Sequence, residues 1–330
     1  MADTSPQPSP HCSPTRNAER EPAHPPSSIL HLHPVFIAGP TAVGKSAVAL
    51  ALAEKIGGEI ISVDSMQVYR GLDLGTAKPT AAERACVPHH LLDLCDLTEA
   101  FDAAQFVRQA ELAVAEIQSR GRTPIFCGGT GLYFKAFLEG LGEAPPADEK
   151  LREELRAAPF AALLDELRER DPAAYEKIDK QNPRRVIRAI EVIRLTGKKF
   201  SGQRSEWTTP RIEATEKKLI CFQRTPEDLH QRINVRVDQM FQRGLVAETS
   251  ELLPRGLAEN MFAMQAIGYR QVVEHLRGER DLAKTIELVK ARTRNFAKRQ
   301  LTWFRRHGNC RWLELKPGET ADETLARWPH

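Results

Sequence analysis

Residues 39–46 have the residue types and the spacing of a phosphate-binding loop. They read Gly-Pro-Thr-Ala-Val-Gly-Lys-Ser and fit the pattern G-x-x-x-x-G-K-[ST]. Glycine lets the backbone point successive N–H groups into one cavity, Lys45 can reach the outer phosphates, and the Ser46 hydroxyl can hold Mg²⁺. The pattern therefore predicts a diphosphate or nucleotide site made by Gly39, Pro40, Thr41, Ala42, Val43, Gly44, Lys45 and Ser46.

The segments around this loop predict the α/β elements that must position it. Residues 34–38 are typical of a short buried strand, and residues 47–55 of an Ala-rich helix that the Gly57-Gly58 pair ends. Residues 59–64 and 123–127 are two further strand candidates with helical patterns between them. Alternation of strand and helix predicts a doubly wound parallel sheet flanked by helices.

Three polar turns, at residues 39–46, 64–67 and 128–131, should meet at one edge of that sheet. Asp64 follows the second strand, and Gly128-Gly129-Thr130-Gly131 follows the third. The carboxyl ends of parallel strands form the ligand edge. Asp64 suits a general base or a Mg²⁺ partner, and the less favoured alternative is that it caps the next element. Gln67 offers the hydrogen-bond donor and acceptor that an adenine edge requires, but a surface glutamine without a role is an equal alternative. Thr130 offers a hydroxyl group to a phosphate, and the alternative is that it belongs to a tight turn without a ligand.

The second half of the chain is mainly helical. After Pro145-Pro146, residues 148–197 show helical patterns alone, residues 218–222 form a strand, and helical periodicity returns over residues 227–306. We expect an all-helical insertion subdomain within the P-loop core, and a helical C-terminal part. The predicted organisation is a disordered Pro-rich tail at 1–33, a core at 34–144 and 210–315, an insertion at 145–209 and a tail at 316–330.

Basic side chains gather in two of the helical stretches. Residues 183–204 carry many arginines and lysines against the single acid Glu191, and residues 290–311 carry no acid. Lys290, Arg294 and Lys298 recur at i, i+4 and form a stripe on one helix face. Such runs are often solvated faces, but two of them in a chain of net charge +3 favour a phosphate backbone as partner. Interleaved aromatic residues suit RNA, whose bases stack on flat side chains.

Composition excludes several classes of protein. The 330 residues are 41% hydrophobic and 28% charged, as in soluble globular proteins. The six cysteines lack C-x-x-C spacing, which predicts reduced thiols, a reducing cytoplasmic compartment, and neither a zinc site nor a disulfide framework. No apolar run is long enough to span a membrane. Adjacent His89 and His90 are expected to pack in a loop. The strand before Gly128 lacks the terminal acid of ATPase motors and GTPase switches.

Seven segments together closely resemble the tRNA dimethylallyltransferase (tRNA isopentenyltransferase) family. The resemblance covers residues from about 35 to 315, and the Asp-Ser-Met-Gln-Val-Tyr-Arg stretch is its most specific part. No zinc-finger pattern follows Trp303, so the chain is more similar to the bacterial form than to the eukaryotic one. The matching segments are residues 39–46, 61–71, 75–79, 88–93, 128–133, 267–270 and 298–303.

The resemblance implies an alkyl transfer. The donor is dimethylallyl diphosphate, and the acceptor is N6 of the adenosine at position 37 of tRNA, beside the anticodon. By resemblance the loop binds the donor's diphosphate, and Lys45 with Mg²⁺ on Ser46 stabilises the leaving diphosphate. Asp64 matches the general base, Thr130 lines the donor channel, and Arg152 takes a further substrate-contacting position. The catalytic set is therefore Asp64, Lys45, Thr130 and Arg152.

The resemblance also implies how the anticodon stem-loop is bound. The target base must leave its stack, so base flipping is expected, and a monomer suffices for the chemistry. Gln265 stands where family members usually carry a basic residue. The implied tRNA contacts are Asp64, Ser65, Met66, Gln67, Thr130, Arg152, Arg184, Arg185, Val186, Ile187, Arg188, Gln265, Ala266, Ile267, Gly268, Tyr269 and Arg270.

Three rival functions remain open at this point. A P-loop small-molecule kinase could use the Arg-rich insertion as a lid. Prenyltransferases that act on free adenine nucleotides are closer relatives, but they lack a large insertion. A non-catalytic RNA-binding protein would not need Lys45, Ser46 and Asp64 together.

Overall fold

The computed structural model describes residues 33–140, 145–203, 219–307 and 310–328. Six parallel strands form one sheet in the order β3-β2-β4-β1-β5-β6. The predicted α/β fold with a parallel sheet is confirmed. The predicted tail at 1–33, except for His33, lies outside the described residues, as do Arg204 and Lys218. The strands are β1 (Val35–Ala38), β2 (Glu59–Val63), β3 (His89–His90), β4 (Pro124–Gly128), β5 (Leu219–Gln223) and β6 (Cys310–Glu314).

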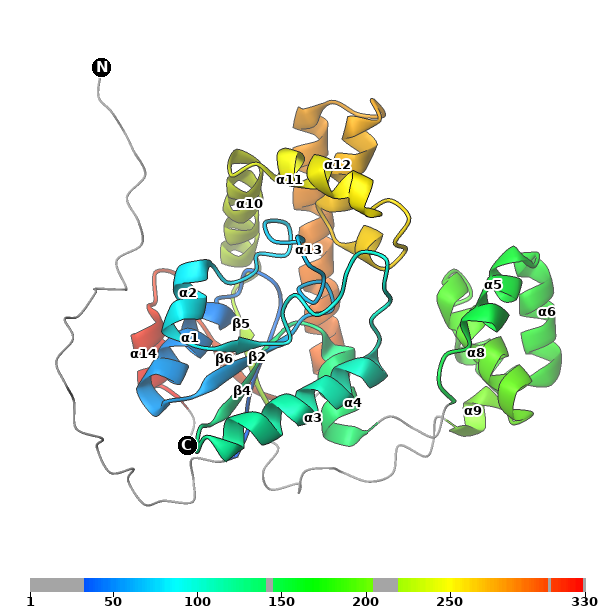
Figure 1. Cartoon of the computed structure of the whole chain (residues 1–330), viewed down its shortest axis with the longest axis horizontal. Coiled ribbons are helices and arrows are strands. Elements are labelled where there is room, and N and C mark those ends of the chain that lie inside the picture. Colours follow the sequence, from blue (N-terminus) through cyan, green and yellow to red (C-terminus); the bar gives the residue numbers. More distant parts are fainter. Residues whose placement is uncertain (1–32, 141–144, 204–218, 308–309, 329–330) are drawn as a thin grey trace.

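Alternation along the strands divides the core into two layers. Phe36 joins one buried cluster and its neighbour Ile37 the other, because successive strand residues point to opposite faces. Helices α3 (Ala103–Ser119) and α4 (Gly131–Glu139) cover the first face (Figure 1). Helices α1 (Lys45–Ile56) and α14 (Ala321–Ala326) cover the second. The sheet is therefore buried on both sides, as a parallel sheet requires.

Three features of the sheet and its surroundings differ from the sequence prediction. His89 and His90 form the short edge strand β3 beside Ile60 and Ile61, although a loop was expected. Strand β6 was not predicted, because it pairs only with β5, far away in the sequence. The predicted C-terminal tail contains helix α14, which a capping box at Thr320 and Glu323 begins.

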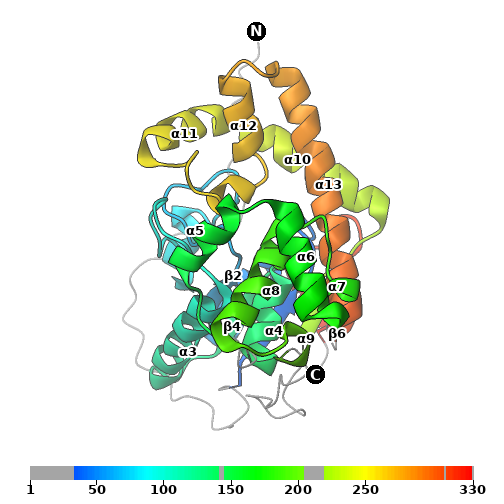
Figure 2. The same cartoon turned by 90° about the vertical axis from the view of Figure 1, so that its right-hand side faces the viewer.

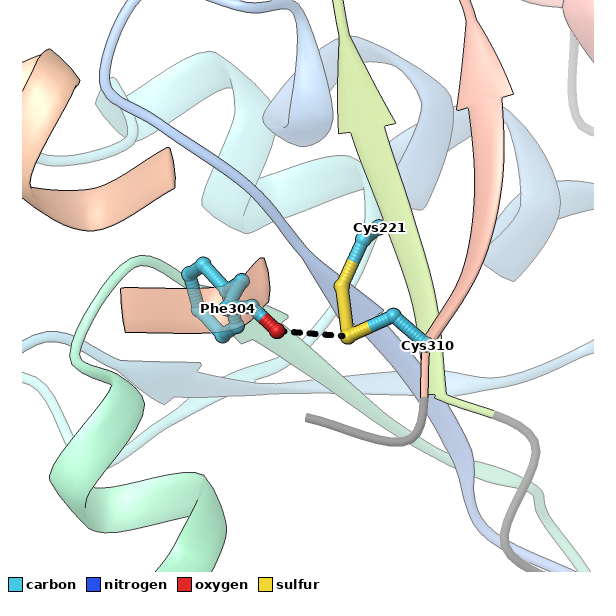
Figure 3. Close-up of a disulfide and its surroundings, with 3 residues drawn as sticks. All are labelled: Cys221, Phe304 and Cys310. Carbon is cyan, nitrogen blue, oxygen red and sulfur yellow. Dashed lines mark hydrogen bonds between the residues drawn. A yellow bond between two sulfur atoms is a disulfide. The ribbon is translucent and has the colours of Figure 1, made fainter. Parts of the chain in front are cut away.

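The prediction that all cysteines are reduced is wrong for one pair. Cys221 of β5 and Cys310 of β6 form a disulfide with Cα atoms 5.7 Å apart (Figure 3). The 89-residue separation hides this pair in the sequence, and only the pairing of β5 with β6 brings the two together. Among the described residues, Cys95 and Cys127 are free thiols.

Every described element between residues 145 and 203 is a helix, in agreement with the sequence pattern. Leu155, Leu167 and Ile190 belong to a buried cluster made only from this segment. The segment stands beside the sheet in Figure 1 and in front of it in Figure 2. Its helices are α5 (Glu149–Ala157), α6 (Phe160–Arg170), α7 (Pro172–Lys177), α8 (Pro183–Thr196) and α9 (Phe200–Gln203).

The remaining helices pack at the ligand edge of the sheet. The longest, α13, runs past α10 and α12 and down toward β6 (Figure 1). In the described part of the chain, no helix combines the length and the apolar composition that crossing a bilayer requires. The other elements are α2 (Ala81–Cys86), α10 (Pro226–Gln242), α11 (Leu245–Leu252), α12 (Tyr269–Leu276) and α13 (Leu282–His307), with short 3-10 turns at Leu253–Arg255 and Ala263–Gln265.

Candidate active site

The phosphate-binding loop connects β1 to α1 as predicted. Gly39 has φ +144°, and a Cβ there would lie 2.7 Å from the Phe222 carbonyl oxygen, so no other residue fits. Gly44 caps α1 in a left-handed conformation and supplies no side-chain acceptor. The first N–H groups of α1 therefore remain available, together with the positive end of the helix dipole, to bind an anion.

The Lys45 side chain folds back over the loop and lines the cavity beside it. Its Nζ donates to the Pro40 carbonyl at 2.7 Å. Burial, and the nearby positive charge of Arg236, lower the pKa of Lys45 to about 8, against the opposing effect of Asp64. A bound diphosphate would raise the pKa of Lys45 again by supplying opposite charge.

Three side chains that the sequence analysis missed hold this loop from outside. Arg224 donates through Nε to the Val43 carbonyl at 2.7 Å, and Arg232 donates to the Ala42 carbonyl at 2.9 Å. Gln300 of α13 accepts from the Thr41 N–H at 2.9 Å. These residues are more than 180 positions away from the loop in the sequence, so no local pattern could have identified them.

Asp64 and Thr130 meet at the predicted edge of the sheet. Asp64 Oδ1 accepts from the N–H groups of Met66 at 2.8 Å and Gln67 at 3.3 Å, and Oδ2 has no hydrogen-bond partner among the described residues. Thr130 Oγ1 accepts from the Ser65 N–H at 3.1 Å, so the Thr130 hydroxyl proton can still be donated to a ligand. Asp64 thus has one oxygen fixed by the turn and one free to accept a proton.

A cavity of about 670 Å³, called the P-loop cavity below, is lined by Lys45, Ser46 and Asp64, and by Gly129, the residue before Thr130. Arg236 of α10 also lines it and makes no hydrogen bond or ion pair to the described residues. Burial lowers the pKa of Arg236, and Asp64 partly opposes that shift. An arginine in such a place suits an anionic ligand. Arg236 follows Arg232 by four positions in a stretch with a helical pattern, which places both side chains on the same helix face. This spacing is the sequence signal that could have identified Arg236.

Gln67 lines the cavity, but its amide is used within the protein. Its Oε1 accepts from Ser62 Oγ at 2.8 Å. Its Nε2 donates to the carbonyls of Thr76 at 3.1 Å and Ala77 at 3.3 Å. In this arrangement Gln67 holds the loop at Thr76 in place, and its reading of an adenine edge stays a prediction.

The structure does not bring Arg152 into the P-loop cavity. Arg152 and Arg188 both bind the buried Glu191, with Arg152 Nε 2.9 Å and Arg188 Nη1 2.6 Å from its carboxylate oxygens. Arg184 donates to the Met261 carbonyl at 2.9 Å and thereby ties the insertion to the core. Val186 is buried in the insertion core. The catalytic role of Arg152 stays a prediction.

A second cavity of about 1040 Å³, called the insertion cleft below, separates α13 from the helical segment. Arg185 of α8 is exposed on one wall, while Lys298 and Arg299 of α13 line the other. Basic side chains on both walls suit a phosphate backbone. The remaining charged or aromatic lining residues are Lys135, Lys177, Phe200, Trp303 and Arg306.

The predicted contact region at residues 265–270 is only partly exposed. Gln265 and Arg270 lie at the surface, whereas Ala266, Gly268 and Tyr269 are buried. The Tyr269 hydroxyl donates to Glu248 at 2.5 Å and accepts from the Gly75 N–H at 3.1 Å, so it positions the 74–76 loop.

Of the predicted basic stripe on α13, only the last member lines the insertion cleft. Lys290 binds Asp238 at 2.8 Å, and Arg294 donates to Asn234 at 2.6 Å, so both pack against α10. The helical repeat placed the three side chains on one face, but it could not tell that α10 covers most of that face.

Mg²⁺ fits the oxygen donors of the P-loop cavity. Within the described residues, no group of three or more His, Cys, Asp or Glu side chains could hold a metal. Ser46 and Asp64 line the same cavity and offer a hydroxyl and a carboxylate. Mg²⁺ commonly uses one or two such protein oxygens and completes its shell with phosphate and water.

Together these features define a P-loop α/β protein in which a phosphate-binding loop lies beside a carboxylate, with a separate basic cleft. The family model described as IPP transferase matches residues 67–307. The tRNA dimethylallyltransferase 1 of Trichlorobacter lovleyi is 46% identical over 286 residues, which is 84% of this chain and 92% of that protein.

Similar solved structures come from the same family of enzymes. The tRNA isopentenylpyrophosphate transferase of Bacillus halodurans is 40% identical with a TM-score of 0.66, over 89% of this chain and 94% of that one. A eukaryotic dimethylallyltransferase acting on tRNA is 30% identical with a TM-score of 0.72, over 86% of this chain and 74% of that one. The chain belongs to the IPP transferase family, the tRNA dimethylallyltransferases.

Proposed function

We propose that this protein transfers the dimethylallyl group of dimethylallyl diphosphate to N6 of adenosine 37 in tRNA and releases diphosphate. One observation carries the proposal: the phosphate-binding loop, Lys45, Arg236 and Asp64 line one cavity. A phosphate site beside a base with a free oxygen suits an alkyl transfer in which the diphosphate leaves. Membership in the family supports this reaction over phosphorylation of a small molecule.

The leaving group is stabilised by groups that are already in place. The first N–H groups of α1 receive the diphosphate, while Lys45 and Arg236 supply positive charge. As the bond from N6 to the allylic carbon forms, the carbon–oxygen bond breaks and its electron pair leaves with the diphosphate. Preorganised donors cost no rearrangement at that moment, so they favour the transition state.

Asp64 takes the proton that N6 loses. An adenine amine is barely basic in water, so removal of its proton must accompany attack on the allylic carbon. Oδ1 is held by the Met66 and Gln67 N–H groups, which leaves Oδ2 as the accepting atom. Thr130, anchored by the Ser65 N–H, has its hydroxyl proton available to orient the substrate.

We propose that Mg²⁺ assists this step when it is bound. Ser46 would hold the ion, with Asp64 close by in the same cavity. An ion held there would supply positive charge that favours departure of the diphosphate.

The insertion cleft is proposed to receive the anticodon stem-loop. Its two walls carry basic side chains, and the flipped adenosine would enter the P-loop cavity from there. A single chain contains both cavities, so a monomer acting in the cytoplasm satisfies the proposal.

The Asp64→Ala variant tests the proposal. Wild-type protein given Mg²⁺, labelled dimethylallyl diphosphate and unmodified tRNA with adenosines at positions 36 to 38 should label the tRNA. The variant should lose labelling by roughly 10³-fold or more, with tRNA affinity nearly intact. Loss of tRNA binding would show that Asp64 is not the base. If the wild-type protein leaves the tRNA unlabelled and instead transfers phosphate from ATP to a small molecule, the proposed function is contradicted.

A further inference from the structure

Gln300 of α13 bridges the two halves of the P-loop cavity. Its Oε1 accepts from the Thr41 N–H at 2.9 Å, and its Nε2 donates to the Gly129 carbonyl at 3.0 Å. The side chain is 8% exposed, so both bonds are shielded from water. Thr41 belongs to the loop that holds the donor, whereas Gly129 precedes Thr130 in the second glycine turn.

The second glycine turn has the glycines that this contact requires. A Cβ on Gly129 would lie 2.2 Å from Gln300 Nε2, and a Cβ on Gly131 would lie 2.1 Å from Trp303 Cε3. The turn is therefore pressed directly against α13. From this turn Thr130 Oγ1 reaches the Ser65 N–H, next to Asp64.

The same helix faces both cavities. Phe296 and Gln300 line the P-loop cavity, one helical turn apart. Lys298, Arg299 and Trp303 line the insertion cleft. Any shift of α13 relative to the sheet would therefore change both cavities together.

We propose that Gln300 is a positioning residue for the alkyl transfer. It holds the donor loop and the Thr130 turn at a fixed separation, and so sets the distance from the allylic carbon to the acceptor nitrogen near Asp64. Because its Oε1 occupies the Thr41 N–H, the diphosphate binds the later N–H groups of the loop. The inference rests on the proposed function, and it names a residue that touches neither reacting atom.

Gln300→Met removes both hydrogen bonds at nearly constant volume. We expect the single-turnover rate of labelling to fall roughly 10- to 100-fold, because small misplacements of reacting groups have effects of that size. The KM values for dimethylallyl diphosphate and for tRNA should stay within about three-fold of wild type. A residue that only stabilises the fold would leave the rate of the folded fraction unchanged.

Thr285→Val is the matched control on the same helix. Thr285 is fully buried, its hydroxyl donates to the Asp281 carbonyl at 2.8 Å, and it lies about 22 Å along α13 from Gln300. It should lower the melting temperature by a few degrees without changing the rate. Gln300→Glu is a second variant that keeps the acceptor for Thr41 but loses the donor to Gly129, and it should also slow the transfer.

A double variant tests the route through the turn. If Gln300 acts by placing Thr130, then Thr130→Val should reduce the rate less in the Gln300→Met background than in the wild type. If the two substitutions reduce the rate independently, so that their effects multiply in the double variant, the proposal is overturned. A folded Gln300 variant whose rate lies within about two-fold of wild type would also overturn it. Failure of both Gln300 variants to fold would show a structural role instead. An inactive wild type would contradict the proposed function and this inference with it, whereas an active wild type with unaffected Gln300 variants would contradict this inference alone.

Discussion

Asp64 and Glu191 show how differently two carboxylates are used in this protein. One carboxylate oxygen of Asp64 accepts hydrogen bonds from the N–H groups of its own turn, and the other oxygen has no such partner at the cavity. Glu191 is fully buried and uses both oxygens to hold Arg152, Arg188 and the Asp148 N–H. The residue types were visible in the sequence, but this division of roles depends on contacts between distant segments. The arginines near Glu191 therefore stabilise the insertion as well as offering charge to a partner.

Replacing Glu191 should reveal this structural role. Burial alone would raise the pKa of Glu191, but hydrogen bonds from Arg188, the Asp148 N–H and Arg152 outweigh burial and hold that pKa below its usual 4.5. The lowered pKa means that Glu191 stabilises the fold above about pH 4.5 and loses this contribution as the pH falls through the folded-state pKa. Glu191→Gln should reduce the free energy of unfolding by about 2–4 kcal/mol near neutral pH, since two arginines lose their partner.

Denaturant unfolding at neutral and acid pH measures this effect. The difference between wild type and Glu191→Gln should shrink as the pH falls below about 4. Glu149→Gln is the control, because Glu149 is an exposed partner of Arg156 on α5 and should change stability by less than about 1 kcal/mol. Equal stability of the wild type and Glu191→Gln would refute the role of this carboxylate.

The helices and strands that could be predicted from the sequence are those with a clear local pattern of apolar residues. The strands at β1, β2, β4 and β5, the loop before α1 and the helical insertion were expected from alternation and turn residues. Strands β3 and β6 were missed because β3 has two residues and β6 depends on its partner β5. The disulfide and the role of Gln300 were missed for the same physical reason, since their contacts join segments that are far apart in the chain.

The insertion cleft makes a prediction about helix α8. Arg185 is exposed there and lines the cleft, so Arg185→Ala should weaken tRNA binding several-fold and reduce the slope of log affinity against log salt by about 1. Arg168→Ala on α6 is the control, because Arg168 is exposed, pairs with Asp165 and does not line the cleft. Binding titrations over a range of salt concentrations distinguish the two. If both variants behave like the wild type, the cleft is not the tRNA site.

For the whole molecule, two cavities share one long helix. The P-loop cavity has the phosphate-binding loop and the Asp64 carboxylate, the insertion cleft has basic walls, and α13 contributes to both. The sequence alone indicated a phosphate site and a polyanion partner separately. If the proposed function holds, this arrangement lets a donor and a large acceptor reach the same carboxylate from different sides.

A doubly labelled donor tests this account most directly. Dimethylallyl diphosphate labelled in its hydrocarbon and in its β-phosphorus should give hydrocarbon label on adenosine 37 of the tRNA. The phosphorus label should appear in free diphosphate in a 1:1 ratio with it. Phosphorus label on the tRNA or on a small acceptor, or diphosphate release without labelled tRNA, would contradict alkyl transfer.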